Sequence, residues 1–137
     1  MRPIKLLLLF VFLNFYAPKG SAQVYRFKTS SVSICEKDAK GKWGEWTDFQ
    51  KSEIAIKLDG DKDRIVVNTQ EQQLYRIAAY MKKVSTATDD TVGFECVDND
   101  GASCIILIVT RKNENNRMQF YINYPDLRLV YNIYNTK

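Results

Sequence analysis

The sequence predicts a single all-β domain of eight to ten antiparallel strands, connected mainly as a meander and arranged as a β-barrel or a two-layer sandwich. Apolar and polar residues alternate along most of the chain from residue 24 to residue 137. Turn-forming residues interrupt this alternation at short intervals, and three pairs of neighbouring segments can be aligned with their apolar side chains on one face. Such alternation is typical of strands that have one face in a hydrophobic core.

Residues 1–22 have the pattern of a secretory signal peptide and are not expected to belong to the fold. A short basic lead precedes an apolar run over residues 6–15, and small residues at 20–22 provide a cleavage site. The run is too short to span a bilayer. We therefore expect a secreted or periplasmic domain, residues 23–137, with no membrane insertion after cleavage.

The composition excludes several kinds of chemistry. The chain contains no histidine, which removes Ser-His-Asp and Cys-His nucleophilic sites and every zinc site that requires an imidazole. Without the signal peptide the net charge falls from +4 to +1, because that segment holds three basic residues and no acidic one. A nearly neutral domain gives no electrostatic reason to expect a nucleic-acid partner. We expect no catalytic residue, no cofactor and no metal site.

Both tryptophans lie between the first predicted strands. Residues 24–34 alternate as a strand, and a turn rich in lysine and glycine at 40–42 leads into the segment 43–49. Trp43 and Trp46 could line a groove for a carbohydrate or a peptide, because flat aromatic faces bind such ligands at a small entropic cost. In a regular strand the two indoles would point to opposite faces, which predicts one core residue and one edge residue instead.

Two short aliphatic segments predict the next hairpin. Pairing Leu58 with Ile65 and Ile56 with Val67 places the apolar side chains on one face, and this requires an even-numbered loop. Acidic residues alternate through the loop 59–63, as they do at the start of a calcium loop. The glycine and glutamate that an EF-hand needs further on are missing, so a solvated hairpin tip explains these acids better.

The segment 71–84 is compatible with a strand or with a helix. Its apolar residues recur at helical spacing, while Tyr75, Ile77 and Ala79 alternate as in a strand. The neighbouring segments all predict strands. A strand is therefore favoured here, and a helix remains the alternative.

A hairpin about Gly101 brings two cysteines together. A three-residue loop with Gly101 in the left-handed conformation pairs Cys96 with Cys104. Because disulfides persist outside the cytoplasm, we predict a disulfide between them, with two facing buried thiols as the alternative. Cys35 is then an inert buried thiol or, less favoured, a link to another chain. Residues 104–109 are apolar at every position, which predicts burial on both faces.

The last hairpin has the clearest core pattern in the chain. Pairing Ile122 with Leu129 and Phe120 with Tyr131 keeps eight apolar or aromatic side chains on one face. The predicted barrel resembles the lipocalin-type barrels in outline, although the sequence contains no motif of that family. Large inward side chains would fill a small barrel and would argue against a ligand in its interior.

The outward face of this hairpin adds two aromatic candidates to the tryptophans. Tyr121 is expected opposite Val130, and this apolar spot suits either a partner protein or, as we favour, covering by another part of the chain. Tyr134 lies further along the same face. The candidate binding residues are therefore Trp43, Trp46, Tyr121 and Tyr134.

The leading hypothesis for function is an exported, non-enzymatic binding module. Its ligand would be a small apolar molecule or an extracellular protein or glycan partner. An inhibitor or immunity-type protein that blocks an extracellular enzyme is the alternative, with loops 36–44 and 85–91 as its candidate contacts. An enzyme that uses carboxylates alone would need two of the four acidic residues near the tryptophans to converge in a cleft. These residues are Glu36, Asp38, Glu45 and Asp48.

Overall fold

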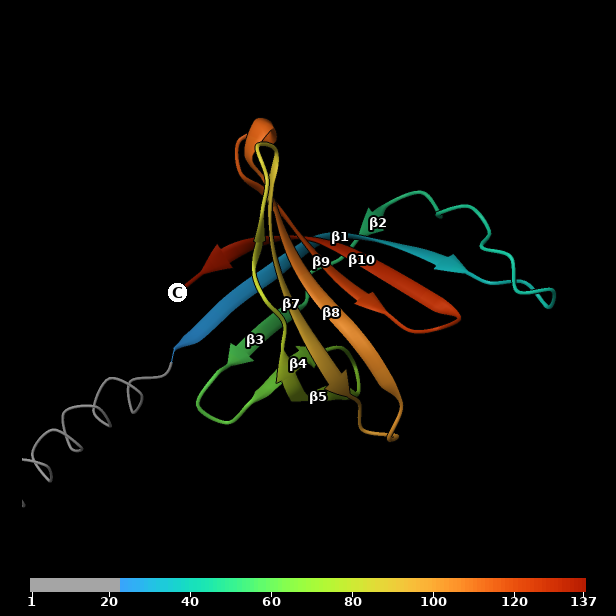
Figure 1. Ribbon diagram of the computed structural model, residues 1–137, viewed down its shortest axis with the longest axis horizontal. Helices are drawn as coiled ribbons and strands as arrows, with labels where there is room; N and C mark the ends of the chain where they lie inside the picture. Colours follow the sequence, from blue (N-terminus) through green and yellow to red (C-terminus); the bar gives the residue numbers. More distant parts are fainter. Residues whose placement is uncertain (1–22) are drawn as a thin grey trace, which may run out of the picture.

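The structure is a computed structural model that describes residues 23–137, so the predicted signal peptide, residues 1–22, lies outside the described residues. Strands make up most of this part of the chain (Figure 1). They are β1 (Val24–Glu36), β2 (Gln50–Lys51), β3 (Ala55–Asp59), β4 (Arg64–Asn68), β5 (Gln72–Tyr80), β6 (Val84–Ser85), β7 (Asp89–Val97), β8 (Ser103–Arg111), β9 (Arg117–Asn123) and β10 (Leu127–Thr136), with a 3₁₀ turn η1 (Lys112–Glu114) before β9.

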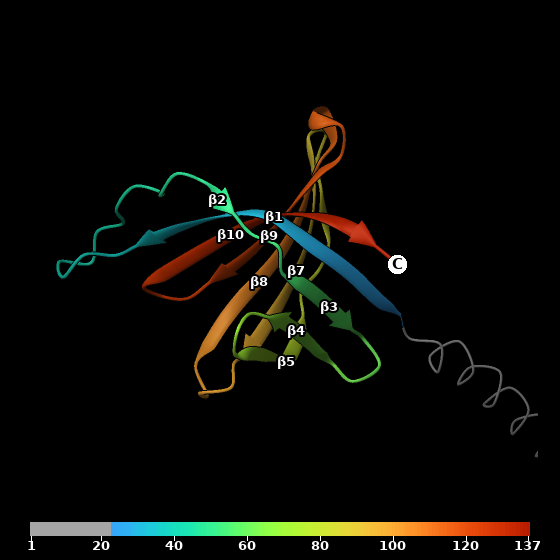
Figure 2. The same ribbon diagram turned by 180° about the vertical axis from the view of Figure 1, so that it is seen from behind.

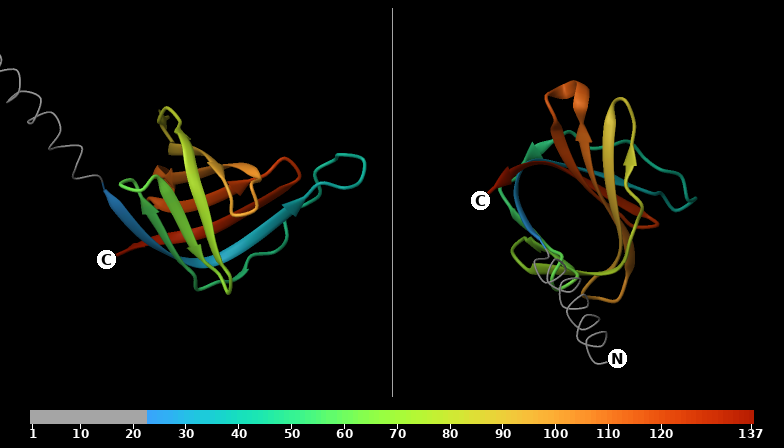
Figure 3. Two further views of the ribbon diagram at one scale, coloured as in Figure 1. Left: turned by 90° about the horizontal axis from the view of Figure 1, so that it is seen from below. Right: turned by 60° about the vertical axis from the view of Figure 1, so that its left-hand side comes forward.

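The main strands form a closed antiparallel barrel. They follow one another as β1-β3-β4-β5-β7-β8-β9-β10, and β10 pairs back with β1, so that Arg26 lies opposite Thr136. Figure 3 shows the ring of strands end-on, and Figure 2 shows the start of β1 beside the end of β10. β2 and β6 lie outside the ring, on β1 and β7. The predicted meander barrel is confirmed, and the chain does not form the alternative sandwich.

The three predicted hairpins have the predicted registers. Ile56 pairs with Val67 and Leu58 with Ile65, as the even-numbered loop required. The other predicted pairs also form: Cys96 with Cys104, Ile122 with Leu129, and Phe120 with Tyr131. In each hairpin the turn and the apolar pattern favour the same register, which is why local sequence was sufficient.

The ambiguous segment 71–84 forms strands. Residues 72–80 are β5, which pairs with β4 and β7, so the strand prediction is confirmed and the helical alternative is wrong. The alternation of Tyr75 and Ile77 points both side chains into the core, and this burial outweighs the helical spacing. No helix in the described part of the chain is long and apolar enough to cross a membrane.

A bulge in β1 changes which of its residues face inward. The register with β10 shifts between Thr29 and Ser31, so Phe27 faces the core before the bulge and Val32 packs against the core after it. Thr29 is buried at the bulge, and its Oγ1 accepts a hydrogen bond from the backbone N–H of Ile54 (2.9 Å). The bulge lets β1 pair with β3 along its first half and with β2 further on.

Apolar side chains fill the middle of the barrel. Phe120, Ile65, Ile106 and Val67 are completely buried there. They belong to one core cluster that every barrel strand contributes to. Burial of these large side chains stabilises the closed ring, and it leaves open space mainly at the two ends of the barrel and on its outer surface.

The predicted disulfide is not present. All three cysteines are buried free thiols, although Cys96 and Cys104 lie opposite each other as expected. The backbone N–H of Asp98 donates to the carbonyl oxygen of Ala102 (2.9 Å), so these two residues form a hydrogen-bonded pair. Hydrogen-bonded pairs recur at every second residue of an antiparallel ladder, so Cys96 and Cys104 form one too. The side chains of such a pair are further apart than those of the pairs between them. Burial raises the pKa of Cys96 to about 12 and that of Cys104 to about 11, so both thiols are protonated at neutral pH.

Candidate functional site

The outer face of β8 is apolar but only partly buried. Its inward residues Ile106 and Ile108 are in the core, whereas its outward residues are Ile105, Leu107 and Val109. Val109 is buried, Leu107 is half-buried, and Ile105 is 39% exposed. The expected burial on both faces is therefore wrong at Ile105, because the barrel wall is a single layer and no second sheet lies over β8. An aliphatic strip remains on the outside of the protein.

The segment that carries both tryptophans runs back along the outer edge of β1. We call residues 37–49 the tryptophan segment; Figure 1 shows it leaving the end of β1 and returning to β2. Thr47 N–H donates to the carbonyl oxygen of Ile34 (2.9 Å), and the hydroxyl of Ser33 donates to the carbonyl oxygen of Thr47 (2.6 Å). The buried thiol of Cys35 donates to the carbonyl oxygen of Gly44 (3.2 Å). These bonds hold the segment beside β1.

Trp43 lies against two cations. The guanidinium carbon of Arg128 is 4.0 Å from the centroid of the indole ring, and the ammonium nitrogen of Lys37 is 5.0 Å from it. Both distances are within the range of cation–π attraction. Among residues 23–137, Arg128 forms no salt bridge and its side chain makes no hydrogen bond. Its guanidinium N–H groups are therefore available to a ligand.

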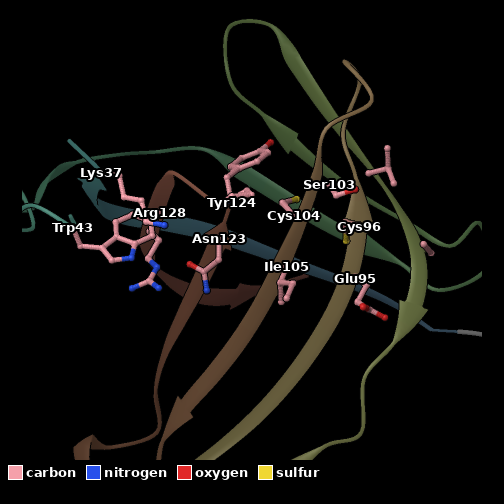
Figure 4. Close-up of a pocket in the computed structure, with 13 residues that line it drawn as sticks. Lys37, Trp43, Glu95, Cys96, Ser103, Cys104, Ile105, Asn123, Tyr124 and Arg128 are labelled. Atoms are coloured by element: carbon pink, nitrogen blue, oxygen red, sulfur yellow. The ribbon is translucent and has the colours of Figure 1, made fainter. Parts of the chain in front are cut away.

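One row of the barrel wall combines this free donor with a free acceptor. Arg128 on β10 pairs with Asn123 on β9, Asn123 pairs with Ile105 on β8, and Ile105 pairs with Glu95 on β7. Asn123 Oδ1 is buried, and it has no hydrogen-bond partner in the described structure. Figure 4 shows Trp43, Lys37 and Arg128 together at one side, Glu95 at the other, and Asn123 with Ile105 between them.

Two shallow hollows lie on this outer surface and share Arg128 and Asn123. The larger, about 740 Å³, lies between Trp43 and Glu95 and also reaches the core residues Cys96 and Cys104 at the end of the barrel. The smaller, about 260 Å³, is lined by Trp46. We call the two together the outer groove. Its main lining residues are Trp43, Trp46, Glu95, Ile105, Leu107, Tyr121, Asn123 and Arg128.

A polar network supports the end of the outer groove at Tyr121. Arg111 donates to Asp89 Oδ1 (3.1 Å), to Gln119 Oε1 (3.0 Å) and to the hydroxyl oxygen of Tyr121 (3.2 Å). Gln119 is buried although it faces outward, and its amide also donates to Asn132 (3.2 Å). Because several bonds converge on Arg111, this part of the outer wall is held in one arrangement.

The structure brings three of the four predicted binding residues together. Trp43, Trp46 and Tyr121 line the outer groove, and Trp46 is 42% exposed there. Tyr121 pairs with Val130 as predicted, and Val130 is buried. Tyr134 is exposed further along β10 and lines neither hollow.

The sequence reasoning missed Arg128 and Asn123. Both are outward positions of the last hairpin, on a face that is mostly polar in the sequence. The outward residues of β8 are aliphatic and lie next to Asn123 in the sheet. This pattern was the signal in the sequence that could have identified Arg128 and Asn123 as candidate binding residues.

Acidic residues in two of the hairpin loops accept hydrogen bonds from the backbone of the turn. Asp98 Oδ1 accepts hydrogen bonds from the N–H groups of Asp100 (2.9 Å) and Ala102 (2.8 Å), and Asp59 Oδ1 accepts one from Asp61 (3.1 Å). Within residues 23–137 no three acidic or cysteine side chains are grouped so as to hold a metal ion. The four acids near the tryptophans are exposed and line neither hollow of the outer groove.

Comparison of the chain with known protein families, with curated proteins and with solved structures finds no match. The site therefore has to be interpreted from its own geometry.

Proposed function

We propose that the chain is an exported, non-enzymatic binding protein and that the outer groove binds a protein partner. The observation that supports this most strongly is the aliphatic outer face of β8, with Ile105 exposed in a single-layer wall. Exposed apolar surface that is rimmed by polar residues is a common mark of a protein-binding site. Export rests on the signal-peptide pattern of residues 1–22.

The chemistry of the outer groove favours a protein over a glycan. Arg128 lies against the ring of Trp43, so this ring is less free to stack on a sugar. Tryptophan, tyrosine and arginine around an aliphatic floor are the residues that dominate binding energy in protein interfaces. The free guanidinium of Arg128 and the unpaired Asn123 Oδ1 match a peptide unit, which offers both an acceptor and a donor.

The barrel interior is less suited to this role. The buried side chains of the core cluster occupy the middle of the barrel, and large inward side chains of this kind argue against a ligand at its centre. The outer groove also explains why β8 is apolar on an outward face that the rest of residues 23–137 covers only in part. A partner that covers Ile105 and Leu107 would bury this strip.

Selection of peptides from a displayed random library on the purified protein tests the proposal. We expect enriched peptides whose affinity falls at least about tenfold with Trp46→Ala and with Ile105→Ser, because these changes remove apolar contact in the smaller and in the larger hollow of the outer groove. Tyr134→Ser is the matched control, since it removes an exposed aromatic side chain outside the groove, and it should leave the affinity unchanged. Failure to enrich any peptide, or equal binding to all three variants, would contradict the proposal.

A further inference from the structure

One end of the barrel is an open apolar hollow that the outer groove does not include. The hollow has a volume of about 340 Å³ and lies where β1 begins and β10 ends. Figure 1 shows these two strand ends on the left. Its lining residues are Tyr25, Phe27, Leu58, Lys83, Asp90, Val92, Ile108, Thr110, Met118 and Asn135. The mouths of β-barrels are frequent positions of small-molecule sites, and this volume is at the lower end of their range.

The base of the hollow is the last layer of the barrel core. Phe27, Leu58 and Ile108 belong to the buried cluster, and Val92 and Met118 pack against it while remaining partly exposed. The aliphatic and aromatic core therefore continues to the surface at this end. An apolar molecule placed here would bury the exposed parts of these side chains.

The rim of the hollow is polar and has an unpaired positive charge. Lys83 lies on the rim and forms no salt bridge with any residue of the described chain. The nearby carboxylate of Asp90 is bound by the ammonium group of Lys112 (3.1 Å) and by the hydroxyl group of Ser85 (2.5 Å), so its charge is already compensated. An anionic group at the rim would therefore be attracted to Lys83.

The opposite end of the barrel is neither apolar nor positively charged. Its mouth is lined by Tyr75, Tyr124 and Tyr131, and the hydroxyl of Tyr124 donates to Asp98 Oδ2 (2.7 Å). Three further acidic residues, Glu71, Asp100 and Asp126, line the same mouth. This end is polar and negatively charged, so an anionic apolar molecule would be repelled from it and attracted to the other.

We propose that the hollow between β1, β3, β7, β8 and β9 is a binding site for a small single-chain amphiphile with an anionic head group. The hydrocarbon chain lies on Phe27, Leu58 and Ile108, and the carboxylate lies at the rim beside Lys83. The site is separate from the outer groove, so it does not depend on the function proposed for that groove. The occupant is a free carboxylate molecule and not a lipid within a membrane.

Displacement of the dye 1-anilinonaphthalene-8-sulfonate by decanoate, followed by fluorescence, tests the site. Decanoate should displace the dye saturably from the purified protein, and Val92→Phe should abolish displacement by filling the hollow. Lys83→Gln should weaken decanoate binding about two- to fivefold and leave decanol binding unchanged, because only the carboxylate interacts with the ammonium group. Lys82→Gln, which removes the neighbouring charge outside the hollow, is the matched control and should have no effect.

Methyl NMR with decanoate keeps the proposal testable if Val92→Phe does not fold. Shifts should be confined to the methyl groups that line the hollow, those of Leu58, Val92, Ile108, Thr110 and Met118, and should not extend to Ile105 or Leu107 of the outer groove. Shifts in the outer groove, absence of saturable binding, or equal binding to Val92→Phe that has folded would overturn the proposal. Co-sedimentation with anionic phospholipid vesicles, without decanoate binding, would point to a membrane surface and would also overturn it.

Discussion

The two faces of β8 have almost the same side chains and opposite surroundings. Ile106 and Ile108 face the barrel interior and are buried, whereas Ile105 and Leu107 face outward and remain partly exposed. The backbone is shared, so the difference comes from what lies on each side of the wall. Inside, the other strands of the ring contribute core residues. Outside, Trp46 of the tryptophan segment lines the hollow beside Leu107, and Met81 lies with Leu107 over Gly93 of β7.

Because of this difference, the inward residues of β8 contribute to stability and its outward residues are available for binding. Inward residues contribute to the free energy of unfolding through close packing. Outward residues that retain exposed apolar area contribute little to it, and they are free to contribute to binding. Changes on the two faces should therefore act on different measurements.

Ile106→Ala should produce the largest loss of stability. Ile106 is completely buried, so its truncation removes packed methyl groups and leaves a cavity, at a cost of about 2–5 kcal/mol in the free energy of unfolding. Ile105→Ala is the matched control on the other face and should cost less than about 1 kcal/mol. Urea unfolding of both variants measures this. Equal losses would mean that the two faces of β8 do not differ.

Alkaline pH should lower the free energy of unfolding through the two buried thiols on the inner face of the barrel. The pKa of Cys96 is raised to about 12 and that of Cys104 to about 11 by burial, from 9.0 for an ordinary thiol. Above pH 9 the unfolded chain loses these protons while the folded protein keeps them, so stability is full below pH 9 and falls as pH rises toward 11. Each retained proton lowers the free energy of unfolding by up to about 1.4 kcal/mol per pH unit.

Urea unfolding between pH 8 and pH 10.5 tests this effect. The double variant Cys96→Ala/Cys104→Ala should show a shallower decline with pH than the parent protein, which separates the thiols from lysine and tyrosine titration. An identical decline in both proteins would show that the thiols are not protected by burial.

Arg111→Met should destabilise the outer wall to a smaller extent. The substitution leaves the buried Gln119 without its guanidinium partner, and we expect a loss of about 1–3 kcal/mol by thermal or urea unfolding. Lys51→Met is the control, because Lys51 and its partner Glu53 are both exposed and such pairs contribute about 0–1 kcal/mol. Similar losses in both variants would show that the network around Arg111 has no special role.

Arg128→Ala should have the smallest effect on stability and a clear effect on binding. Its contact with Trp43 is worth about 0.5–1 kcal/mol at an exposed site. Affinity for groove-selected peptides should fall about tenfold or more, and Arg128→Lys should restore it only in part, because lysine lacks the planar fork. Unchanged affinity for Arg128→Ala would remove this residue from the site.

Local sequence predicted the hairpins because turn residues and apolar alternation specify the same pairing, as at Leu58 with Ile65. It could not predict which strands meet at closure, since the pairing of β1 with β10 joins segments about a hundred residues apart. The side-chain geometry of Cys96 and Cys104 could not be predicted either. The turn and the apolar pattern predict that the two residues face each other, but they do not determine the distance between the side chains. Arg128 and Asn123 are candidate binding residues because they lie beside the aliphatic outer face of β8, and this arrangement is visible only in the folded barrel.

Labelling of single introduced cysteines with a maleimide tests the difference between the two faces of β8 most directly. Ile105→Cys should react rapidly in the folded protein, over a low background from the three buried native thiols, and a groove-selected peptide should slow the reaction. Ile106→Cys, checked for folding by circular dichroism, should react only after unfolding. Rapid labelling at both positions, or protection of residue 105 in the free protein, would contradict the account.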